Sequence, residues 1–336
     1  MLAAHHNLWA DHPTPESLPP VVVNDPALPL VSVVTPSYNQ GRFIRATIES
    51  VLTQDYPNIE YWVIDGGSTD ETVSILREYE HDPRFHWLSE PDKGQSDAVN
   101  KGWSRCRGEI LGWLNSDDTY MPGATSFQVQ SLLRHPDVGL VYGNAVYTNE
   151  HGQIVGEYHA RPFHRTRYLH VSSIPQPTAF LRRHLFEQCG GLDVGLRYAL
   201  DFEFFLRLMW ETTFLHTGEL LATYRIHRTS KTVSGSDAML AETIRVVQQV
   251  CDQHAEELPG TKDKAVSDWF WCGAINSLDA RSYHQALKYT LFAIHSCPLR
   301  PRIATFGLKV FDTLFHTRIT DRVISFLDRR AYRLSL

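Results

Sequence analysis

The chain has few cysteines and lacks several familiar ligand-binding motifs. Its five cysteines, at positions 106, 189, 251, 272 and 297, form no Cys-x-x-Cys pair, so neither a disulfide framework nor a zinc ribbon is suggested. None of the 17 histidines belongs to a His-Glu-x-x-His motif. The phosphate-binding patterns G-x-x-x-x-G-K-[ST] and G-x-G-x-x-G are also missing, which argues against an ATPase or a dinucleotide-binding protein.

The sequence also lacks a long apolar run, a secretory leader and an excess of positive charge. No apolar stretch approaches the ~18 residues of a membrane span, and no signal-peptide pattern begins the chain, so we expect a cytoplasmic protein. The formal net charge of −6 gives no support for nucleic acid as a partner. With 336 residues, 43% of them hydrophobic, the chain can bury one large core or two modest ones.

The hydrophobic pattern changes along the chain and predicts three regions. Residues 1–29 hold six prolines and little periodicity, which predicts an extended leader. Residues 30–235 alternate strand-like and helical segments, the pattern of βαβ units and a doubly wound, mostly parallel α/β sheet. Within this domain we separate a first half, 30–122, from a second half, 123–235. From 236 to 336 the pattern is helical and predicts a C-terminal extension.

Polar residues follow each of the first four expected strands, at 30–35, 59–64, 85–88 and 110–114. Open α/β sheets bind ligands outside the carboxyl ends of their strands. In any one loop these residues could simply form a turn, where Asp, Asn, Gly and Ser are common. Four successive strand ends with such residues favour one shared ligand that has a base, a ribose and a diphosphate. Carboxylates at such an edge suit Mg²⁺ or Mn²⁺ shared with phosphates. The residues are Tyr38 and Asn39, Asp65, Lys93 with Gly94 and Gln95, and Asp117 with Asp118.

Four segments together resemble family 2 of the glycosyltransferases. They are VVTPSYN at 33–39, VIDGGSTDET at 63–72, DKGQSDAVNKG at 92–102 and WLNSDD at 113–118. The resemblance covers roughly residues 30 to 230 and implies a GT-A fold, a nucleotide-diphosphate sugar donor, with a UDP-sugar expected, and a divalent cation, Mn²⁺ or Mg²⁺. It further implies a glycan or lipid-linked acceptor in polysaccharide or glycoconjugate synthesis.

The resemblance also implies roles for individual residues. Tyr38 would stack on the base and Asp65 would hydrogen-bond it, while Asp117, with Asp118 beside it, would bring the metal to the diphosphate. His227 would reach the metal or the diphosphate. Asn115 stands where the family usually has the first Asp of Asp-x-Asp, so metal binding depends on Asp117. The predicted nucleotide-sugar-binding residues are Pro36, Ser37, Tyr38, Asn39, Asp65, Lys93, Gly94, Gln95, Asn100, Asn115 and Ser116.

An acid among apolar residues stands in the second half, at Asp201 in YALDFEFFLRL. A buried carboxylate is costly unless it is paired or functional, and a helix N-terminus would favour its charged form. The ordinary alternative is that Asp201 caps a helix and Glu203 lies on its solvated face. The family has its catalytic base at the matching place, usually within Glu-Asp, where this chain has Leu200-Asp201. We therefore predict Asp201 as the base, with Glu203 as second candidate.

The end of the chain is basic and amphipathic. Residues 300–336 contain eight Lys or Arg and three Asp, with apolar residues at helical spacing. This pattern predicts either peripheral binding at the inner face of a membrane or packing against the chain's own domain or a second subunit.

The predicted function is that of an inverting, metal-dependent glycosyltransferase. Two alternatives stay open at this point. One is a GT-A-fold nucleotidyltransferase, which would release pyrophosphate, and the other is a non-catalytic nucleotide- or sugar-binding scaffold.

Overall fold

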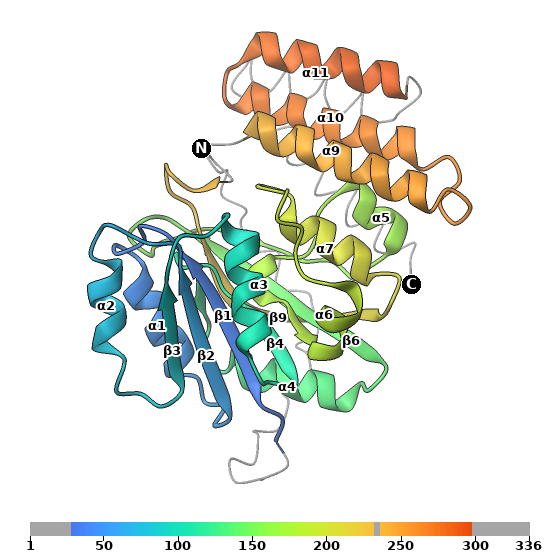
Figure 1. The fold of residues 1–336 in the computed structure, drawn as a ribbon. Helices are drawn as coiled ribbons and strands as arrows, with labels where there is room; N and C mark the ends of the chain where they lie inside the picture. The colour runs from blue at the N-terminus through green and yellow to red at the C-terminus, as the bar shows by residue number, and fades with distance from the viewer. Residues whose placement is uncertain (1–27, 232–235, 298–336) are drawn as a thin grey trace. The chain divides into compact units, whose positions relative to one another are not determined.

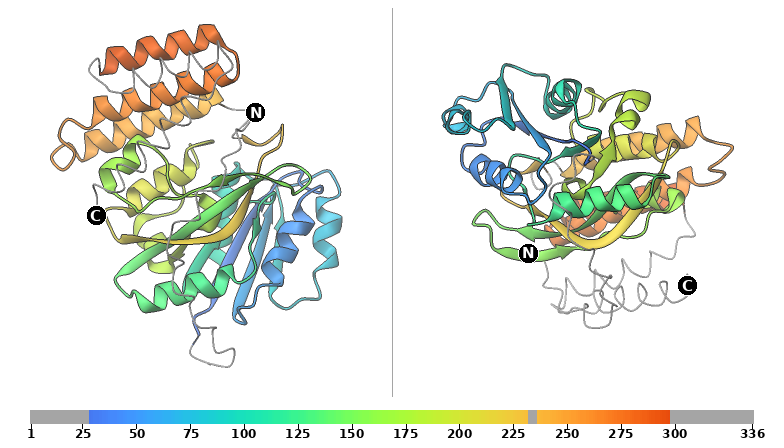
Figure 2. Two further views of the ribbon diagram at one scale, coloured as in Figure 1. Left: turned by 180° about the vertical axis from the view of Figure 1, so that it is seen from behind. Right: turned by 90° about the horizontal axis from the view of Figure 1, so that it is seen from below.

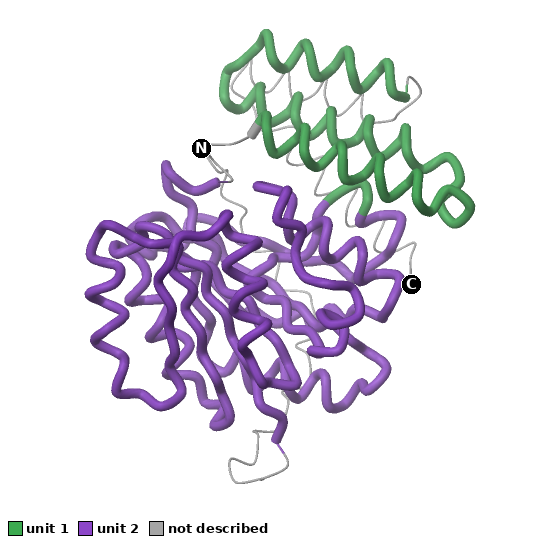
Figure 3. Tube along the Cα trace, in the orientation of Figure 1, with its two compact units in different colours: residues 1, 169–171, 235–336 green, residues 2–168, 172–234 purple. Residues whose placement is uncertain are grey.

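A computed structural model of the chain describes residues 28–231 and 236–297. These residues form two compact units, a larger one up to residue 231 and a smaller, helical one that follows (Figure 3). Residues 169–171 belong to the helical unit. Most of the predicted leader and the predicted basic stretch at 300–336 lie outside the described residues.

The larger unit is built on one mixed sheet. Its strands follow the order β3-β2-β1-β4-β8-β6-β9-β5, and β7 pairs with β6 beside this path. Strands β1 to β4 are mutually parallel, and β8 runs antiparallel to both β4 and β6. The strands are β1 Val31–Ser37, β2 Ile59–Asp65, β3 Phe85–Ser89, β4 Ile110–Trp113, β5 Thr119–Tyr120, β6 Val138–Thr148, β7 Ile154–Tyr158, β8 Phe180–Arg182 and β9 Thr213–Arg225.

Helices cover both faces of this sheet (Figures 1 and 2). Helices α1, α2 and α4 pack on one face, and α3, α6 and α7 pack on the other. On the second face, Trp103 of α3 contacts Trp113, Phe186 and Phe204 through its ring. The helices are α1 Ile44–Leu52, α2 Thr72–Glu78, α3 Gln95–Arg105, α4 Ala124–Arg134, α5 Arg165–His170, α6 Arg183–Cys189 and α7 Leu200–Leu208, with a 3₁₀ turn η1 at Gln176–Thr178.

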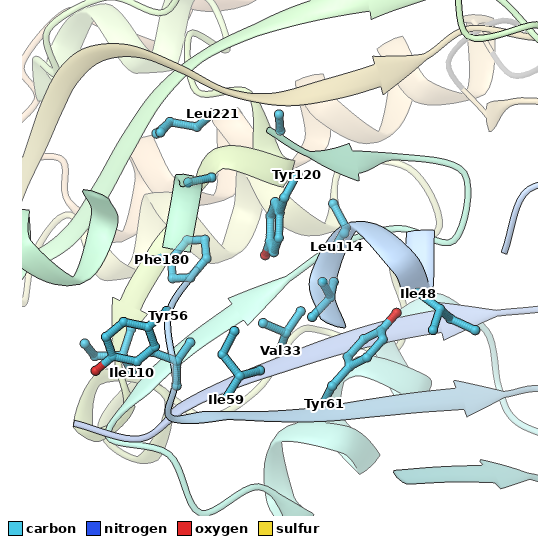
Figure 4. Close-up of a cluster of buried hydrophobic side chains, with 14 of the residues drawn as sticks. Val33, Ile48, Tyr56, Ile59, Tyr61, Ile110, Leu114, Tyr120, Phe180 and Leu221 are labelled. Carbon is cyan, nitrogen blue, oxygen red and sulfur yellow. The ribbon is translucent and has the colours of Figure 1, made fainter. Parts of the chain in front are cut away.

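The main core lies between the sheet and the first of these helix layers (Figure 4). Ile44, Ile48 and Val51 of α1 keep the spacing of one helix face and are fully buried, as amphipathic periodicity predicts. Each such side chain contributes about 1.5–3 kcal/mol when it is fully buried. Two core tyrosines also satisfy their hydroxyl groups, because Tyr61 donates to Thr35 Oγ1 and Tyr56 donates to the carbonyl of Pro29.

The predicted fold class, an α/β sheet with flanking helices and further helices after it, is confirmed. The sheet is mixed, because four of the eight strand pairings among the described residues are antiparallel. Strands β1 and β2 run slightly further than expected, to Ser37 and Asp65. Because β1 to β4 are parallel, their carboxyl ends share one edge of the sheet. That edge holds most of the residues that the sequence singled out.

The helical unit consists of α9 Ser236–Gln253, α10 Lys262–Asp279 and α11 Tyr283–Ser296. Its helices are joined by polar contacts, such as the buried hydrogen bond from Ser267 Oγ to the carbonyl of Ala293 and the part-buried one from the Tyr289 hydroxyl to Asp237 Oδ1. Within the same unit, His170 Nδ1 lies 2.8 Å from the buried Asp268 Oδ2. None of the described helices is both long and apolar enough to cross a membrane.

Candidate active site

The end of β1 presents an exposed ring and a buried hydroxyl. Tyr38, just beyond the strand, is 61% exposed, whereas Ser37 is buried. The Oγ of Ser37 has no hydrogen-bond partner among the described residues, which is unusual for a buried polar atom. The preceding residue, Pro36, pairs with Ile64 inside the sheet. Asn39 has a positive φ of 52° and its side-chain oxygen accepts the Thr69 N–H, so it ties this loop to the next.

Asp65, at the end of β2, is the centre of a hydrogen-bond cluster. Its carboxylate accepts the N–H groups of Gly67 and Ser68, at 3.2 and 2.9 Å, and the hydroxyls of Ser68 and Ser89, at 2.5 and 2.7 Å. Oδ2 accepts three of these bonds and Oδ1 accepts one, which leaves an acceptor position on Oδ1. The carboxylate therefore orders the loop 66–68, and its predicted hydrogen bond to a base stays a prediction.

The loop between β3 and α3 contains Gly94, whose backbone conformation other residues adopt with difficulty. Gly94 has a φ of 110°, a region that L-residues avoid, and its N–H donates to Asp92 Oδ1 at 2.7 Å. Lys93 beside it is exposed. Ser96, in the first turn of α3, is buried, and its Oγ has no partner in the described part of the chain. The sequence reasoning missed Ser96, whose only signal was its place beside Gln95.

An amide network lies at the end of β4. Asn115 Oδ1 accepts hydrogen bonds from Gln95 Nε2 at 2.7 Å and Trp113 Nε1 at 2.9 Å. Asn115 Nδ2 donates to Gln176 Oε1 at 3.0 Å and to Asp118 Oδ2 at 3.2 Å. An aspartate at position 115 could not donate to Asp118 and would add a second negative charge there. Asparagine at this position therefore fits the network that surrounds it.

The two adjacent acids have different surroundings. Asp118 is buried, and its Oδ1 accepts the backbone N–H of Arg225 at 2.8 Å. Burial and the charge of Asp117 raise the pKa of Asp118 well above its usual range. Neighbouring Ser116 is also buried. The buried Asp118 carboxylate thus holds the end of β9 to this turn, whereas the side chain of Asp117 is 20% exposed. The predicted metal contact of Asp118 stays a prediction.

Asp117 meets His227 across the site. Asp117 Oδ2 lies 3.0 Å from His227 Nε2, while His227 Nδ1 lies 2.9 Å from Thr229 Oγ1 and its ring packs on Phe43. A carboxylate oxygen and an imidazole nitrogen are suitable ligands for Mn²⁺, and Mg²⁺ takes one or two carboxylates and completes its shell with phosphates and water. Among the described residues no group of three or more His, Cys, Asp or Glu converges on a metal position. The pair therefore fits a cation that is shared with a substrate.

The two carboxylates predicted as the base also differ. Burial raises the pKa of Asp201 above its usual range, although nearby backbone N–H groups and the charge of Lys231 oppose that shift. Glu203, two residues further along α7, forms a bidentate ion pair with Arg207, at 2.6 and 2.9 Å. Arg207 in turn donates to the carbonyls of Cys189 and Gly191. Glu203 thus stabilises α7 and its neighbouring loop, and the role of Asp201 as the base stays a prediction.

Lys231 connects these two parts of the site. Its Nζ donates to Gln95 Oε1 at 2.6 Å and to the carbonyl of Arg197 at 3.3 Å, and its charge acts on Asp201. Sequence reasoning missed Lys231, although it is a cation four residues after His227. Asn100, by contrast, binds the N–H and the carbonyl of Leu192. It holds the two halves of the domain together, and its predicted contact with the nucleotide-sugar stays a prediction.

Comparison with known proteins decides the classification. The model of "Glycosyl transferase family 2" matches residues 32–191. An uncharacterized glycosyltransferase of Mycobacterium tuberculosis is 34% identical over 186 residues, which are 53% of this chain and 68% of that protein. The chain belongs to glycosyltransferase family 2. This family 2 glycosyltransferase is also 26% identical over 223 residues to the chondroitin synthase of Escherichia coli, of which it spans 32%.

Two solved structures share the fold of this family 2 glycosyltransferase. Staphylococcus aureus TarS 1–349 in complex with UDP-GlcNAc has a TM-score of 0.55 and 15% identity, and the match covers 80% of this chain and 91% of that one. The mannosyltransferase PcManGT from Pyrobaculum calidifontis, in complex with GDP-Man and Mn²⁺, has a TM-score of 0.51 and 20% identity, over 90% and 92% of the two chains. The family and the fold predicted from the four sequence segments are therefore confirmed.

Proposed function

We propose that this enzyme transfers a sugar from a UDP-sugar to a hydroxyl of a glycan or lipid-linked acceptor, in polysaccharide or glycoconjugate synthesis. The observation that carries the proposal is the connection of the Asp117–His227 pair to the Asp201 region. Asp118 and Asn115 join Asp117 to Gln95, and Gln95 binds the same Lys231 that acts on Asp201. This connection supports one site with a metal at Asp117 and His227 and a base at Asp201.

The donor is proposed to lie along the carboxyl ends of β1 to β4. Tyr38 offers an exposed ring to the base, and Asp65 orders the loop beside it. Ser37 and Ser96 flank this position, and their covered hydroxyls have no hydrogen-bond partner among the described residues. UDP is favoured as the nucleotide because TarS, which shares the fold, holds UDP-GlcNAc.

A divalent cation, Mn²⁺ or Mg²⁺, is proposed to bind Asp117 and His227. When bound it would offset the negative charge that grows on the departing diphosphate. The Mn²⁺ in the mannosyltransferase structure supports this choice. Arg225 keeps Asp117 in place, because its Nε donates to the Asp117 carbonyl at 2.7 Å.

The proposed reaction is a single displacement. Asp201 accepts the proton of the acceptor hydroxyl while that oxygen forms a bond to the anomeric carbon. The bond from the anomeric carbon to the diphosphate oxygen breaks, and its electron pair leaves with the nucleoside diphosphate. One displacement inverts the anomeric configuration. The raised pKa of Asp201 brings its basicity closer to neutral pH, which suits a general base.

The test is a panel of UDP-, GDP-, CDP- and dTDP-sugars, screened by thermal shift with Mn²⁺ and then assayed for transfer or slow hydrolysis. We expect one nucleotide to stabilise the protein and the nucleoside diphosphate to be released. Release of pyrophosphate instead would identify a nucleotidyltransferase, and binding without any turnover would identify a scaffold.

A further inference from the structure

Three tyrosines from adjacent strands of the larger unit meet on one face of the sheet. Tyr147 of β6 stacks on Tyr158 of β7, with ring centroids 5.5 Å apart and planes at 20°, and it meets Tyr224 of β9 edge-on at 5.8 Å. Tyr147 and Tyr224 are direct register partners. Opposite Tyr147 on β7 stands Gly156, which has no side chain to separate the two stacked rings.

These three tyrosines differ from the core tyrosines of the same unit. All three are partly exposed, whereas Tyr142 and Tyr168 are completely covered. Packing alone does not require three large aromatic side chains to gather where water still reaches them. A partly exposed aromatic cluster is typical of a ligand-binding surface.

The cluster borders the proposed base. Burial raises the pKa of the Tyr158 hydroxyl, and the charge of Asp201 acts on it in the same direction. Asp201 acts in the same way on Tyr168, which packs on Phe202, the residue next to Asp201. The contacts agree with this placement, because the Tyr158 hydroxyl donates to the carbonyl of Ser172 at 3.4 Å, four residues after Tyr168, and Tyr168 packs on the neighbour of Asp201.

We propose that Tyr147, Tyr158 and Tyr224 form an acceptor subsite that stacks a pyranose ring and brings one of its hydroxyls to Asp201. The inference rests on the proposed function, because it takes Asp201 as the base. A pyranose ring carries several C–H groups on one face, and the negative face of an aromatic ring attracts polarised C–H groups. A tyrosine side chain also loses little conformational entropy when ligand binding fixes its position. The ligand class is a saccharide, so the acceptor presents a sugar, rather than a bare lipid, to the base.

The experiment measures saccharide binding by saturation-transfer NMR on the full chain with UDP and Mn²⁺ present. The probes are the methyl β-glycosides of glucose, galactose and N-acetylglucosamine. We expect transfer to the ring C–H protons of at least one glycoside. Tyr147→Leu and Tyr224→Leu should weaken that binding several-fold, up to about tenfold, the size of one aromatic contact. Tyr147→Phe keeps the ring and should retain the binding.

A matched control is Tyr79→Leu, which removes an aromatic ring that packs on Phe85 and Arg45 away from β6, β7 and β9. It should leave saccharide binding unchanged. The affinity for UDP and the melting temperature of each variant report whether it is folded.

The outcomes separate a saccharide subsite from a purely structural tyrosine cluster. If both leucine variants lower the melting temperature but leave saturation transfer unchanged, the tyrosines only hold β7 to the sheet and the proposal is wrong. Absence of transfer to every glycoside, in wild-type protein that binds UDP, also overturns it. Tyr147-dependent saccharide binding without any UDP binding would support the subsite while the proposed donor fails.

Discussion

His227 Nε2 lies 3.0 Å from Asp117 Oδ2, although 110 residues separate them in the chain. The strand pairing of β5 with β9 explains the meeting. Thr119 faces Thr223 in antiparallel register, so the residues after Thr223 run back over the residues before Thr119. The backbone N–H of Arg225 then reaches Asp118, and His227 reaches Asp117. The proposed metal position is thus set by the sheet and not by one loop alone.

The first prediction concerns this pair. Asp117→Asn and His227→Gln should each reduce the gain in UDP affinity that Mn²⁺ provides, by at least the ~10–100-fold that metal sites lose when a supporting group is removed. The reason is that each variant removes a ligand while the base and ribose contacts remain. Titration calorimetry with Mn²⁺ and with a chelator measures the gain. Asp137→Asn, at an exposed position, is the control, and equal affinity with and without Mn²⁺ in the wild type would refute the prediction.

Sequence reasoning located the strand ends because they depend on local patterns. Short apolar runs that end in polar residues indicate where strands leave a parallel sheet, and Asp65 and Asp117 were found this way. The fold followed from the alternation of such runs with amphipathic helices. His227 came from the family resemblance, since one histidine has no local signal that marks it as a ligand.

The remaining contacts depend on partners far away in the chain. Ser68 and Glu71 have the spacing of a capping box, but Ser68 Oγ accepts the N–H of Asn39 and Asp70 Oδ2 accepts the N–H of Gly41, each 29 residues away. Gln176 joins Asn115 across 61 residues and Lys231 joins Gln95 across 136. No spacing rule describes such contacts, because they exist only once the sheet has formed.

The second prediction tests what Asp65 does. Asp65→Asn removes acceptor positions from a carboxylate that binds four donors, and we expect about 1–3 kcal/mol less stability. Because the lost bonds order the loop 66–68, affinities for UDP, CDP and GDP should fall by similar factors. Calorimetry with the three nucleotides checks this. A loss confined to one nucleotide would instead show that Asp65 reads the base directly, as the family resemblance implies.

The third prediction concerns a carboxylate that supports the fold near the start of β2. Glu60 is only 4% exposed, and although burial disfavours its charge, hydrogen bonds from Ser32 and Arg107 outweigh it and lower the pKa of Glu60. A carboxyl group whose pKa is lowered by folding stabilises the folded state at pH values above its pKa in the unfolded chain, about 4.3. This contribution is lost as the pH falls below that value. Glu60→Gln should therefore lower the free energy of unfolding by about 1–3 kcal/mol at pH 7. The difference in stability between wild type and variant should shrink below about pH 4.

Denaturant unfolding of wild type and variant at several pH values measures this difference. UDP affinity should not change, because Glu60 stands near the beginning of β2 and the donor is proposed at its end. Glu187→Gln, whose side chain is 58% exposed, is the control and should alter stability by less than about 0.5 kcal/mol. The prediction would be contradicted if the loss of stability in Glu60→Gln became larger as the pH falls.

The last prediction decides between the two carboxylates of α7. Asp201→Asn keeps the volume of the side chain but not its basicity, so turnover should fall by about 10²–10⁴-fold while UDP affinity stays the same. Glu203 is bound to Arg207 by two hydrogen bonds, so Glu203→Gln should cost about 1–3 kcal/mol of stability and keep turnover within the same order of magnitude. Because burial raises the pKa of Asp201, the base takes up its proton above the ordinary value of about 3.9. The acid limb of the wild-type kcat profile should therefore lie above that pH and be absent from Asp201→Asn. Normal turnover in Asp201→Asn together with a loss in Glu203→Gln would make Glu203 the base.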